Sequence, residues 1–216
     1  MGVPCLIMAS CNSRADEKSN PFFSEYNTPF DVPPFEKIHA KHYMPAFEKG
    51  MEEGRKDIQN LLSNSEEPNF ENTIGAFDRA GKLLTKVASV FFAQASANTS
   101  DSLQAIEMEI SPRLSAYQDE IILNPELFSR VKHVYDNQAS ESLSDEQKFI
   151  LENLYKEFVR NGANLNTVDQ DTLRNINQKL SVLAVQFNQN VLAETNNYKL
   201  FVDLSLINIS EPTRPY

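Results

Sequence analysis

Three residues near the start of the chain have the types and the spacing of metal ligands. His39 and His42 stand three residues apart, and Glu36 precedes His39 by the same interval. Imidazole and carboxylate groups bind zinc, and a carboxylate-bridged metal site in a helical bundle takes a Glu-x-x-His motif from each of two helices. The chain contains that motif once. The spacing therefore favours the start of a helix, exposed or packed, over a metal site.

Motifs that would complete an active site are missing from the sequence. None of the three histidines is followed by glutamate, so the His-Glu-x-x-His zinc motif does not occur. The Gly-x-Ser-x-Gly motif and the glycine-rich phosphate loops are absent too. His133 has no partner at ligand spacing and is expected at the surface or the core edge, and the acidic pairs Glu52-Glu53 and Asp119-Glu120 are expected on solvated helix faces. The residues alone indicate no catalytic residue, no metal ligand and no cofactor site in this chain.

The composition is that of an acidic, globular chain. Of its 216 residues, 41% are hydrophobic, which is enough for one sizeable core or for a large piece of a bigger one. The 30 acidic and 20 basic residues give a net charge of -10, which argues against nucleic acid as a partner because phosphate would be repelled. Both cysteines, Cys5 and Cys11, precede the body of the chain, so we expect neither a disulfide nor a cysteine metal site to hold the fold.

The first part of the chain has the pattern of an anchor and a tether. Residues 1–11 form a short apolar run that ends in Ala9-Ser10-Cys11 and resembles a bacterial lipoprotein signal, with Cys11 as the lipid attachment site. This interpretation places the protein in the cell envelope, in the periplasm or at the outer membrane. The alternative is a disordered start and a cytoplasmic protein. Residues 12–34 are expected to form a polar tether and an extended arm, since four prolines exclude a helix and leave these aromatic residues to lie on the body: Phe22, Phe23, Tyr26 and Phe30. No segment is long enough to span a bilayer as a helix.

Hydrophobic periodicity predicts a long helix over residues 70–97. Apolar and small residues recur there at steps of four and three, at Phe70, Ile74, Phe77, Gly81, Leu84, Ala88, Phe91 and Ala95. Small residues between Gly75 and Gly81 should allow another helix to approach closely. We expect this segment to be the scaffold helix of the fold.

Further helices are expected on both sides of this segment. One opens at Pro45, and another begins at residues 99–101 and contains Pro112, which should kink or interrupt it. Asn124-Pro125 and the capping box Ser144–Gln147 mark two more helix starts, and Thr167–Gln170 repeats the capping box.

The last of these helices should run to about Asn196 with a continuous apolar face. Its members are Leu173, Ile176, Leu180, Leu183, Phe187 and Val191. Tyr198–Val202 is expected as a short strand. The whole pattern predicts an all-α fold, an antiparallel array of about six helices within residues 35–203.

Several stretches match a known family in order along the chain. They are residues 34–47 (Pro-Phe-Glu-Lys-Ile-His-Ala-Lys-His-Tyr-Met-Pro-Ala-Phe), Gly50-Met51, 69–74, 90–92, Ser111-Pro112, Asn124, 158–165 and 187–192. Over residues 21–203 the chain thereby resembles the thimet-oligopeptidase and peptidyl-dipeptidase family of zinc metallopeptidases. The residues in these stretches are most similar to those of the peptidyl-dipeptidase branch.

The resemblance implies an amino-terminal part of a larger, two-lobed α-helical enzyme. In that family the amino-terminal helices form one wall and part of the roof of a deep channel for short peptides, and the peptidyl-dipeptidase branch removes dipeptides from carboxyl ends. It implies zinc in the full-length enzyme, with zinc ligands, general base and substrate-orienting tyrosine outside this chain. We therefore expect the chain to be inactive alone, to bind no zinc itself, and to expose a large apolar face where its missing carboxyl-terminal catalytic region packs.

The match to the family stops at Leu204. Residues 204–216 resemble the translation of a transposon adapter used in sequencing libraries, apart from Asn208, and are expected to be a non-native tail; the alternative is a diverged natural tail. A second function also stays open, namely a helical lipoprotein that binds peptides or a protein partner without catalysis. Whether the gene continues in frame to a His-Glu-x-x-His motif separates the two functions.

Overall fold

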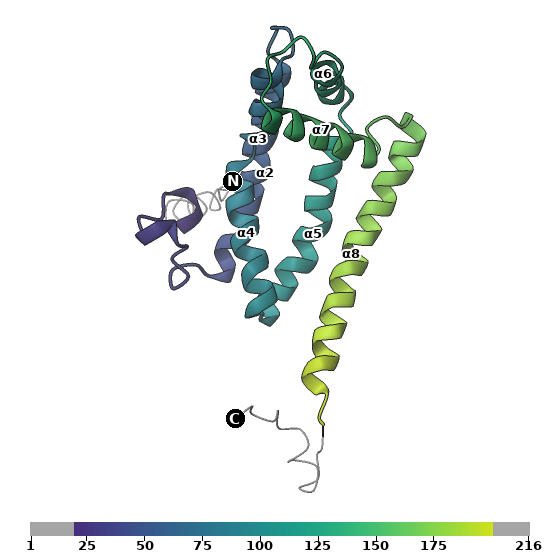
Figure 1. Ribbon diagram of the computed structural model, residues 1–216. Helices are drawn as coiled ribbons and strands as arrows, with labels where there is room; N and C mark the ends of the chain where they lie inside the picture. Colours follow the sequence, from purple (N-terminus) through teal and green to yellow (C-terminus); the bar gives the residue numbers. More distant parts are fainter. Residues whose placement is uncertain (1–19, 201–216) are drawn as a thin grey trace, which may run out of the picture.

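The computed structural model describes residues 20–200, and helices dominate this range (Figure 1). Its elements in chain order are η1 (Pro21–Phe23), η2 (Pro29–Asp31), α2 (Ala40–Leu62), η3 (Phe70–Gly75), α3 (Ala76–Asp78), α4 (Lys82–Ala97), α5 (Asp101–Ile122), α6 (Pro125–Asp136), α7 (Asp145–Arg160) and α8 (Thr167–Asn197). No β-strand occurs among the described residues. The expected all-α fold of about six helices is confirmed. Cys11 and residues 204–216 lie outside the described range, so the anchor and tail stay predictions.

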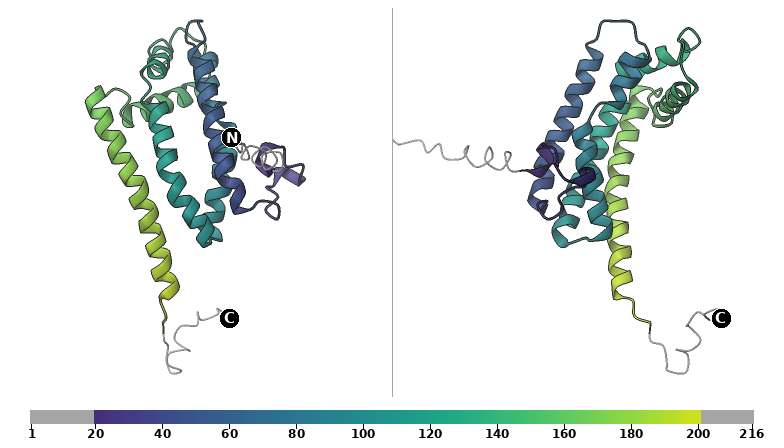
Figure 2. Two further views of the ribbon diagram at one scale, coloured as in Figure 1. Left: turned by 180° about the vertical axis from the view of Figure 1, so that it is seen from behind. Right: turned by 60° about the vertical axis from the view of Figure 1, so that its left-hand side comes forward.

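Helix α4 runs antiparallel to α2, and α8 runs antiparallel to α5. Helices α2 and α5 run parallel to each other, since Glu48 pairs with Arg113 and Arg55 pairs with Glu120. Helices α2, α4 and α5 pack together, and α6 and α7 cross one end of this group (Figures 1 and 2). Helix α8 lies along α5 and continues past the other end of the bundle (Figures 1 and 2). Within residues 20–200, no helix combines the length and the apolarity that a membrane crossing needs.

Two hydrophobic clusters hold these helices together. The first joins α2, α4 and α5 around Tyr43, Phe47 and Phe91, all fully buried, with the rings of Tyr43 and Phe47 meeting that of Phe91 edge-on at 5.0 and 5.4 Å. The second joins the end of α2 to η3, α6 and α7 around Leu127, Leu151 and Phe158. Helix α8 contributes little to either cluster, since Val185 is its only buried residue among those described.

The single helix expected over residues 70–97 is wrong, because the backbone breaks at Gly81. This glycine adopts the left-handed conformation (φ +67°), which suits a residue without a β-carbon, and its N–H donates to Asp57 Oδ2 at 3.0 Å. Residues Phe70–Gly75 before the break form a wide π-type turn. Helix α2 approaches this segment closely at Gly81, as expected, since a β-carbon on Gly54 would lie 3.5 Å from Gly81 Cα. A second close approach lies at Gly50, where a β-carbon would stand 2.8 Å from the Leu84 backbone of α4.

Several predicted helix ends also shift. Helix α2 begins before Pro45, at Ala40, and α5 continues through Pro112 without interruption. The residue that caps α8 is Asn166, whose side chain accepts from the Asp169 N–H, and not Thr167, so the repeated capping box is wrong by one residue. The end of α8 at Asn197 agrees with the prediction, whereas Tyr198–Leu200 form no strand and the rest of that segment lies outside the described residues.

The arm before α2 packs on the body through most of its aromatic residues, but it is not extended throughout, because the short 3-10 helices η1 and η2 start at Pro21 and Pro29. Phe22 is buried, Phe23 and Tyr26 pack against the first cluster, and Lys86 of α4 donates to the Phe22 and Ser24 carbonyl oxygens at 3.3 and 2.7 Å. Phe30 is the exception, with 99% of its surface exposed. The arm is therefore fixed by Lys86 and its first aromatic residues.

Candidate functional site

The two histidines at metal-ligand spacing, His39 and His42, lie at the start of α2. His39 is the residue before the first turn, and its backbone N–H donates to Nδ1 of His42 at 3.1 Å. His42 is buried, and its ring centroid lies 5.4 Å from that of His39. Glu36 is exposed on the preceding turn. No group of three or more His, Cys, Asp and Glu residues that could hold a metal ion occurs within residues 20–200. Nδ1 of His42 accepts from the His39 N–H at the helix start, so Glu36, His39 and His42 do not form a metal site there.

The remaining candidates lie at the surface, with one exception. His133 is partly exposed, and its Nε2 lies 3.4 Å from Glu67 Oε1, which confirms the expected position at the core edge. Glu52, Glu53 and Glu120 are exposed or partly exposed, and Glu120 pairs with Arg55 at 2.8 Å. Asp119 departs from the expected solvated face, because it turns toward α8.

Polar side chains join α8 to α5 at two levels of an antiparallel seam. Asn177 Nδ2 donates to Asp119 Oδ1 at 2.7 Å, and Gln189 Nε2 donates to the Gln104 carbonyl oxygen at 3.2 Å and interacts with the Glu107 carboxylate. The same number of residues separates Asp119 from Glu107 on α5 as separates Asn177 from Gln189 on α8. The two amides thus fix the register of the helices.

Partial burial raises the pKa of both carboxyl groups in this seam. Desolvation is the main cause at Glu107 and at Asp119, and it outweighs the opposing hydrogen bonds from Gln189 and Asn177. Arg174 also acts against the shift at Asp119. In the seam between α5 and α8, the charged forms of both carboxyl groups are therefore less stable than they are in water.

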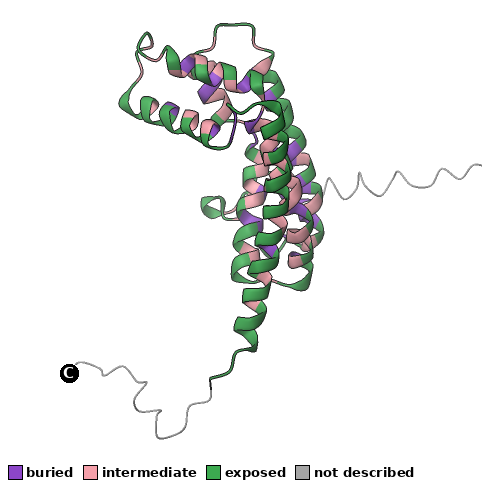
Figure 3. Cartoon of the chain, turned by 90° about the vertical axis from the view of Figure 1, so that its right-hand side faces the viewer, coloured by how far each residue is buried: buried purple, intermediate pink, exposed green. Residues whose placement is uncertain are grey.

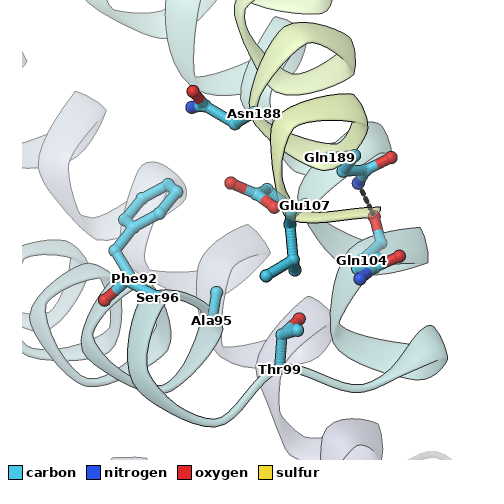
Figure 4. A pocket seen from close by; sticks show the side chains of 9 residues that line it. Phe92, Ala95, Ser96, Thr99, Gln104, Glu107, Asn188 and Gln189 are labelled. Carbon is cyan, nitrogen blue, oxygen red and sulfur yellow. Dashed lines mark hydrogen bonds between the residues drawn. The ribbon is translucent and has the colours of Figure 1, made fainter. Parts of the chain in front are cut away.

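A cleft of about 370 Å³ opens where α8 passes the junction of α4 and α5 (Figure 4). Its lining is mixed, with the Phe92 ring on one side, the amides of Asn188 and Gln189 on another, and the Glu107 carboxylate between them (Figure 4). Such a surface offers hydrogen-bond acceptors and donors beside one apolar ring. It has the chemistry to contact a peptide backbone, but its lining pairs the hydroxyl groups of Ser96 and Thr99 with no histidine base and contains no set of metal ligands.

A second side of α8 presents an apolar face to solvent, and Leu180 at its edge also lines a pocket against α5. We call the α8 stripe the set of exposed residues Ile176, Leu180, Leu183, Phe187 and Val191. Phe187 has 67% of its surface exposed and Leu180 has 60%. Their spacing of three and four places them on one face of the helix, and most of α8 is exposed in Figure 3. The large exposed apolar face expected from the family resemblance is confirmed.

Sequence reasoning found the stripe but not which side of α8 faces the bundle. Periodicity grouped Leu173 with the stripe, whereas in the structure Leu173 is half-buried and the stripe is exposed. The inner face uses Asn177, Val185 and Gln189 instead. No short-range signal marks Asn177 and Gln189 as inner residues, because the twelve residues between them place them about 120° apart around the helix.

Comparisons with known proteins find peptidases that are similar to this chain. No protein-family model matches the chain. Dipeptidyl carboxypeptidase of Escherichia coli is 38% identical over 184 residues, 85% of this chain and 27% of its own length. The enzyme of the same name from Salmonella typhimurium is 36% identical over 86% of this chain and 27% of its own length. Oligopeptidase A of Escherichia coli is 26% identical over 82% of this chain and 26% of its own length. The chain therefore spans about a quarter of the length of the curated relatives that it matches.

Proposed function

We propose that this chain is the helical wall of a peptidase that acts on short peptides. The premise is that the chain belongs to the thimet oligopeptidase family, as an amino-terminal part of proteins like dipeptidyl carboxypeptidase and oligopeptidase A. The similarity to dipeptidyl carboxypeptidase favours release of dipeptides from carboxyl ends as the reaction of the whole protein. The observation that carries the proposal is the match, which covers 85% of this chain at 38% identity.

In this proposal the chain shapes the enzyme and the rest of the protein performs the cleavage. Zinc would be the metal of the whole protein, held by residues from the part of the family proteins that this chain does not match. Helices α2, α4 and α5 supply a rigid frame through the first hydrophobic cluster. Helix α8 presents one face to that frame and the stripe to the rest of the protein. The chain alone would then be an inactive piece of a zinc peptidase.

Peptide cleavage by the purified chain tests this proposal. The chain is incubated with a short blocked peptide, with and without added zinc, and dipeptide release is followed by mass spectrometry. Escherichia coli dipeptidyl carboxypeptidase serves as the positive control. We expect no release by the chain and rapid release by the control. Zinc-dependent cleavage that stays with the chain through size-exclusion chromatography would contradict the inactive-wall proposal.

A second candidate function is peptide binding without catalysis. The cleft beside Glu107 and the exposed α8 stripe favour it, because they offer polar and apolar contacts in the absence of a described ligand set. Isothermal titration of the chain with a mixed set of short peptides would distinguish it, since this function requires measurable affinity without the rest of an enzyme. Binding too weak to measure would favour the first proposal, in which the chain is the helical wall of a peptidase.

We also propose that the protein resides in the cell envelope through a lipid on Cys11. The support is the sequence of residues 1–11, which ends in Ala9-Ser10-Cys11. Expression of the full chain in a bacterium, with and without Cys11→Ala, tests it by fractionation. Recovery of both forms in the cytoplasm would contradict the anchor.

A further inference from the structure

The α8 stripe lacks the features of a helix face that evolved to meet water. Its five apolar residues span Ile176–Val191, a length of about 22 Å at 1.5 Å per residue. From Asn175 to Leu192 the helix has a single charged residue, Lys179. Solvent-exposed helix faces in soluble proteins normally place charged residues opposite the core. An exposed apolar patch with few charges is typical of the centre of a protein interface.

The seam with α5 gives α8 an inner face that is already in use. Asn177 and Gln189 hydrogen-bond to α5, and Val185 is buried against the bundle. Rotating α8 to bury the stripe on α5 would expose Val185 and break both amide contacts. The stripe is therefore a second face, which meets the inner face only at Leu180, and no described residue covers most of it.

Resting on the proposed function, we propose that the α8 stripe is the docking surface for an amphipathic helix of the remaining part of the same peptidase. The family proteins extend over roughly four times the matched length, since the match covers 27% of Escherichia coli dipeptidyl carboxypeptidase, so they contain ample chain to cover this face. The stripe has the length of about four helical turns and the three-and-four spacing into which side chains of a second helix interdigitate. The near absence of charge on α8 favours an uncharged, apolar seam in that partner helix.

The stripe's residues predict which substitutions disrupt the contact. Phe187 and Leu183 lie on adjacent turns at the centre of the stripe, with 67% and 59% of their surfaces exposed. The double substitution Leu183→Glu and Phe187→Glu places two charges where the partner helix would be apolar. Its matched control is Gln186→Glu with Asn190→Glu, which adds the same charges at exposed positions of the same turns beside the stripe.

Co-purification tests the docking surface. The chain is co-expressed with an affinity-tagged remainder of Escherichia coli dipeptidyl carboxypeptidase, the part that lies outside the match, and the fraction of chain retained on the tag is measured. We expect the unmodified chain and the control variant to be retained, and retention of the stripe variant to fall at least tenfold. Circular dichroism of each purified variant verifies that the helices are kept.

Three results would overturn the inference. The first is equal retention of the stripe variant and the control, and the second is no retention of the unmodified chain. The third is sedimentation of the chain alone as a dimer that the stripe substitutions abolish, because a second copy would then be the occupant. Peptide cleavage by the retained complex reports on the proposed function separately. A stripe-dependent complex that cleaves no peptide would refute the peptidase role and leave the docking surface standing, whereas a cleaving complex indifferent to the stripe would refute the docking surface alone.

Discussion

The Tyr117 hydroxyl of α5 lies only 2.0 Å from the point where a β-carbon on Gly54 of α2 would stand. Tyr117 is buried, with the guanidinium carbon of Arg55 5.2 Å from the centre of its ring. Gly50, one turn earlier on α2, makes a different kind of approach, to the Leu84 backbone of α4. Two glycines on one helix thus admit two neighbours, one through a side chain and the other through a main chain.

Gly54→Ala is therefore expected to destabilise the chain, by about 1–3 kcal/mol, because the new methyl group collides with the Tyr117 hydroxyl. Tyr117→Phe removes the hydroxyl, so in that background Gly54→Ala should cost clearly less, helped by the higher helix propensity of alanine, although the ring Cζ stays 3.2 Å from the new methyl group. Urea unfolding followed by circular dichroism measures the stability of the unmodified chain, the two single variants and the double variant. Gly50→Ala is the control, since its clash is with Leu84 backbone atoms and Tyr117→Phe should not relieve it. Equal costs of Gly54→Ala in both backgrounds would show that the hydroxyl is not the obstacle.

The carboxyl groups in the α5–α8 seam predict a pH effect. Burial raises the pKa of Glu107 and Asp119, so the folded chain binds their protons more tightly than the unfolded chain does. Their contribution to stability is therefore favourable below the ordinary carboxyl pKa of about 4 and is lost as pH rises through the raised values. Glu107→Gln and Asp119→Asn should each stabilise the chain at pH 7, by less than about 1 kcal/mol because both groups keep solvent contact, and the gain should shrink toward pH 4.

Urea unfolding at pH 4 and pH 7 measures this difference. Asparagine at position 119 keeps an oxygen that can accept from Asn177, so the hydrogen bond survives while the charge is removed. Glu146→Gln on the exposed first turn of α7 is the matched control and should show no comparable gain. Loss of stability at pH 7 in both seam variants would mean that the charged forms are favoured in the folded chain.

Lys86 should decide whether the amino-terminal arm stays on the body. Its ammonium group donates to two arm carbonyl oxygens and lies 3.9 Å from the centre of the Tyr26 ring. Lys86→Met keeps the apolar stem and removes these contacts, so we expect a loss of about 1–2 kcal/mol in stability. Chymotrypsin should also cleave faster at the aromatic residues of the arm. Lys82→Met, at an exposed position of the same helix, should change neither quantity, and an unchanged cleavage rate in Lys86→Met would show that the aromatic residues alone hold the arm.

The start of α7 depends on a reciprocal pair of hydrogen bonds. Ser144 Oγ accepts from the Gln147 N–H at 3.2 Å, and Gln147 Oε1 accepts from the Ser144 N–H at 2.9 Å. Ser144→Ala should cost about 1 kcal/mol in urea unfolding because one helix N–H loses its partner. Ser142→Ala, two residues earlier and exposed, is expected to be neutral. A neutral Ser144→Ala would indicate that packing of α7 on α6 alone fixes this helix end.

Local signals in the sequence were sufficient where a helix end is built from neighbouring residues. Asn124 and Ser144 cap α6 and α7 as predicted, because a capping hydrogen bond spans only two or three residues. The expected continuity through Gly81 failed because the apolar spacing continues across a residue whose left-handed backbone is held by Asp57, a partner on another helix. Glu36, His39 and His42 had ligand spacing, yet the contact that forms is between a histidine ring and the backbone at the start of α2.

By itself the sequence determined the helical class, most helix ends, the family resemblance and the existence of an apolar face on residues 173–191, since all of these depend on residue type and short-range spacing. Only the tertiary structure decided which side of α8 faces inward. Periodicity places apolar residues on one side of a helix, but it does not say what lies opposite that side. The amides of Asn177 and Gln189 take the inner position on α5, and the stripe from Ile176 to Val191 is left facing outward.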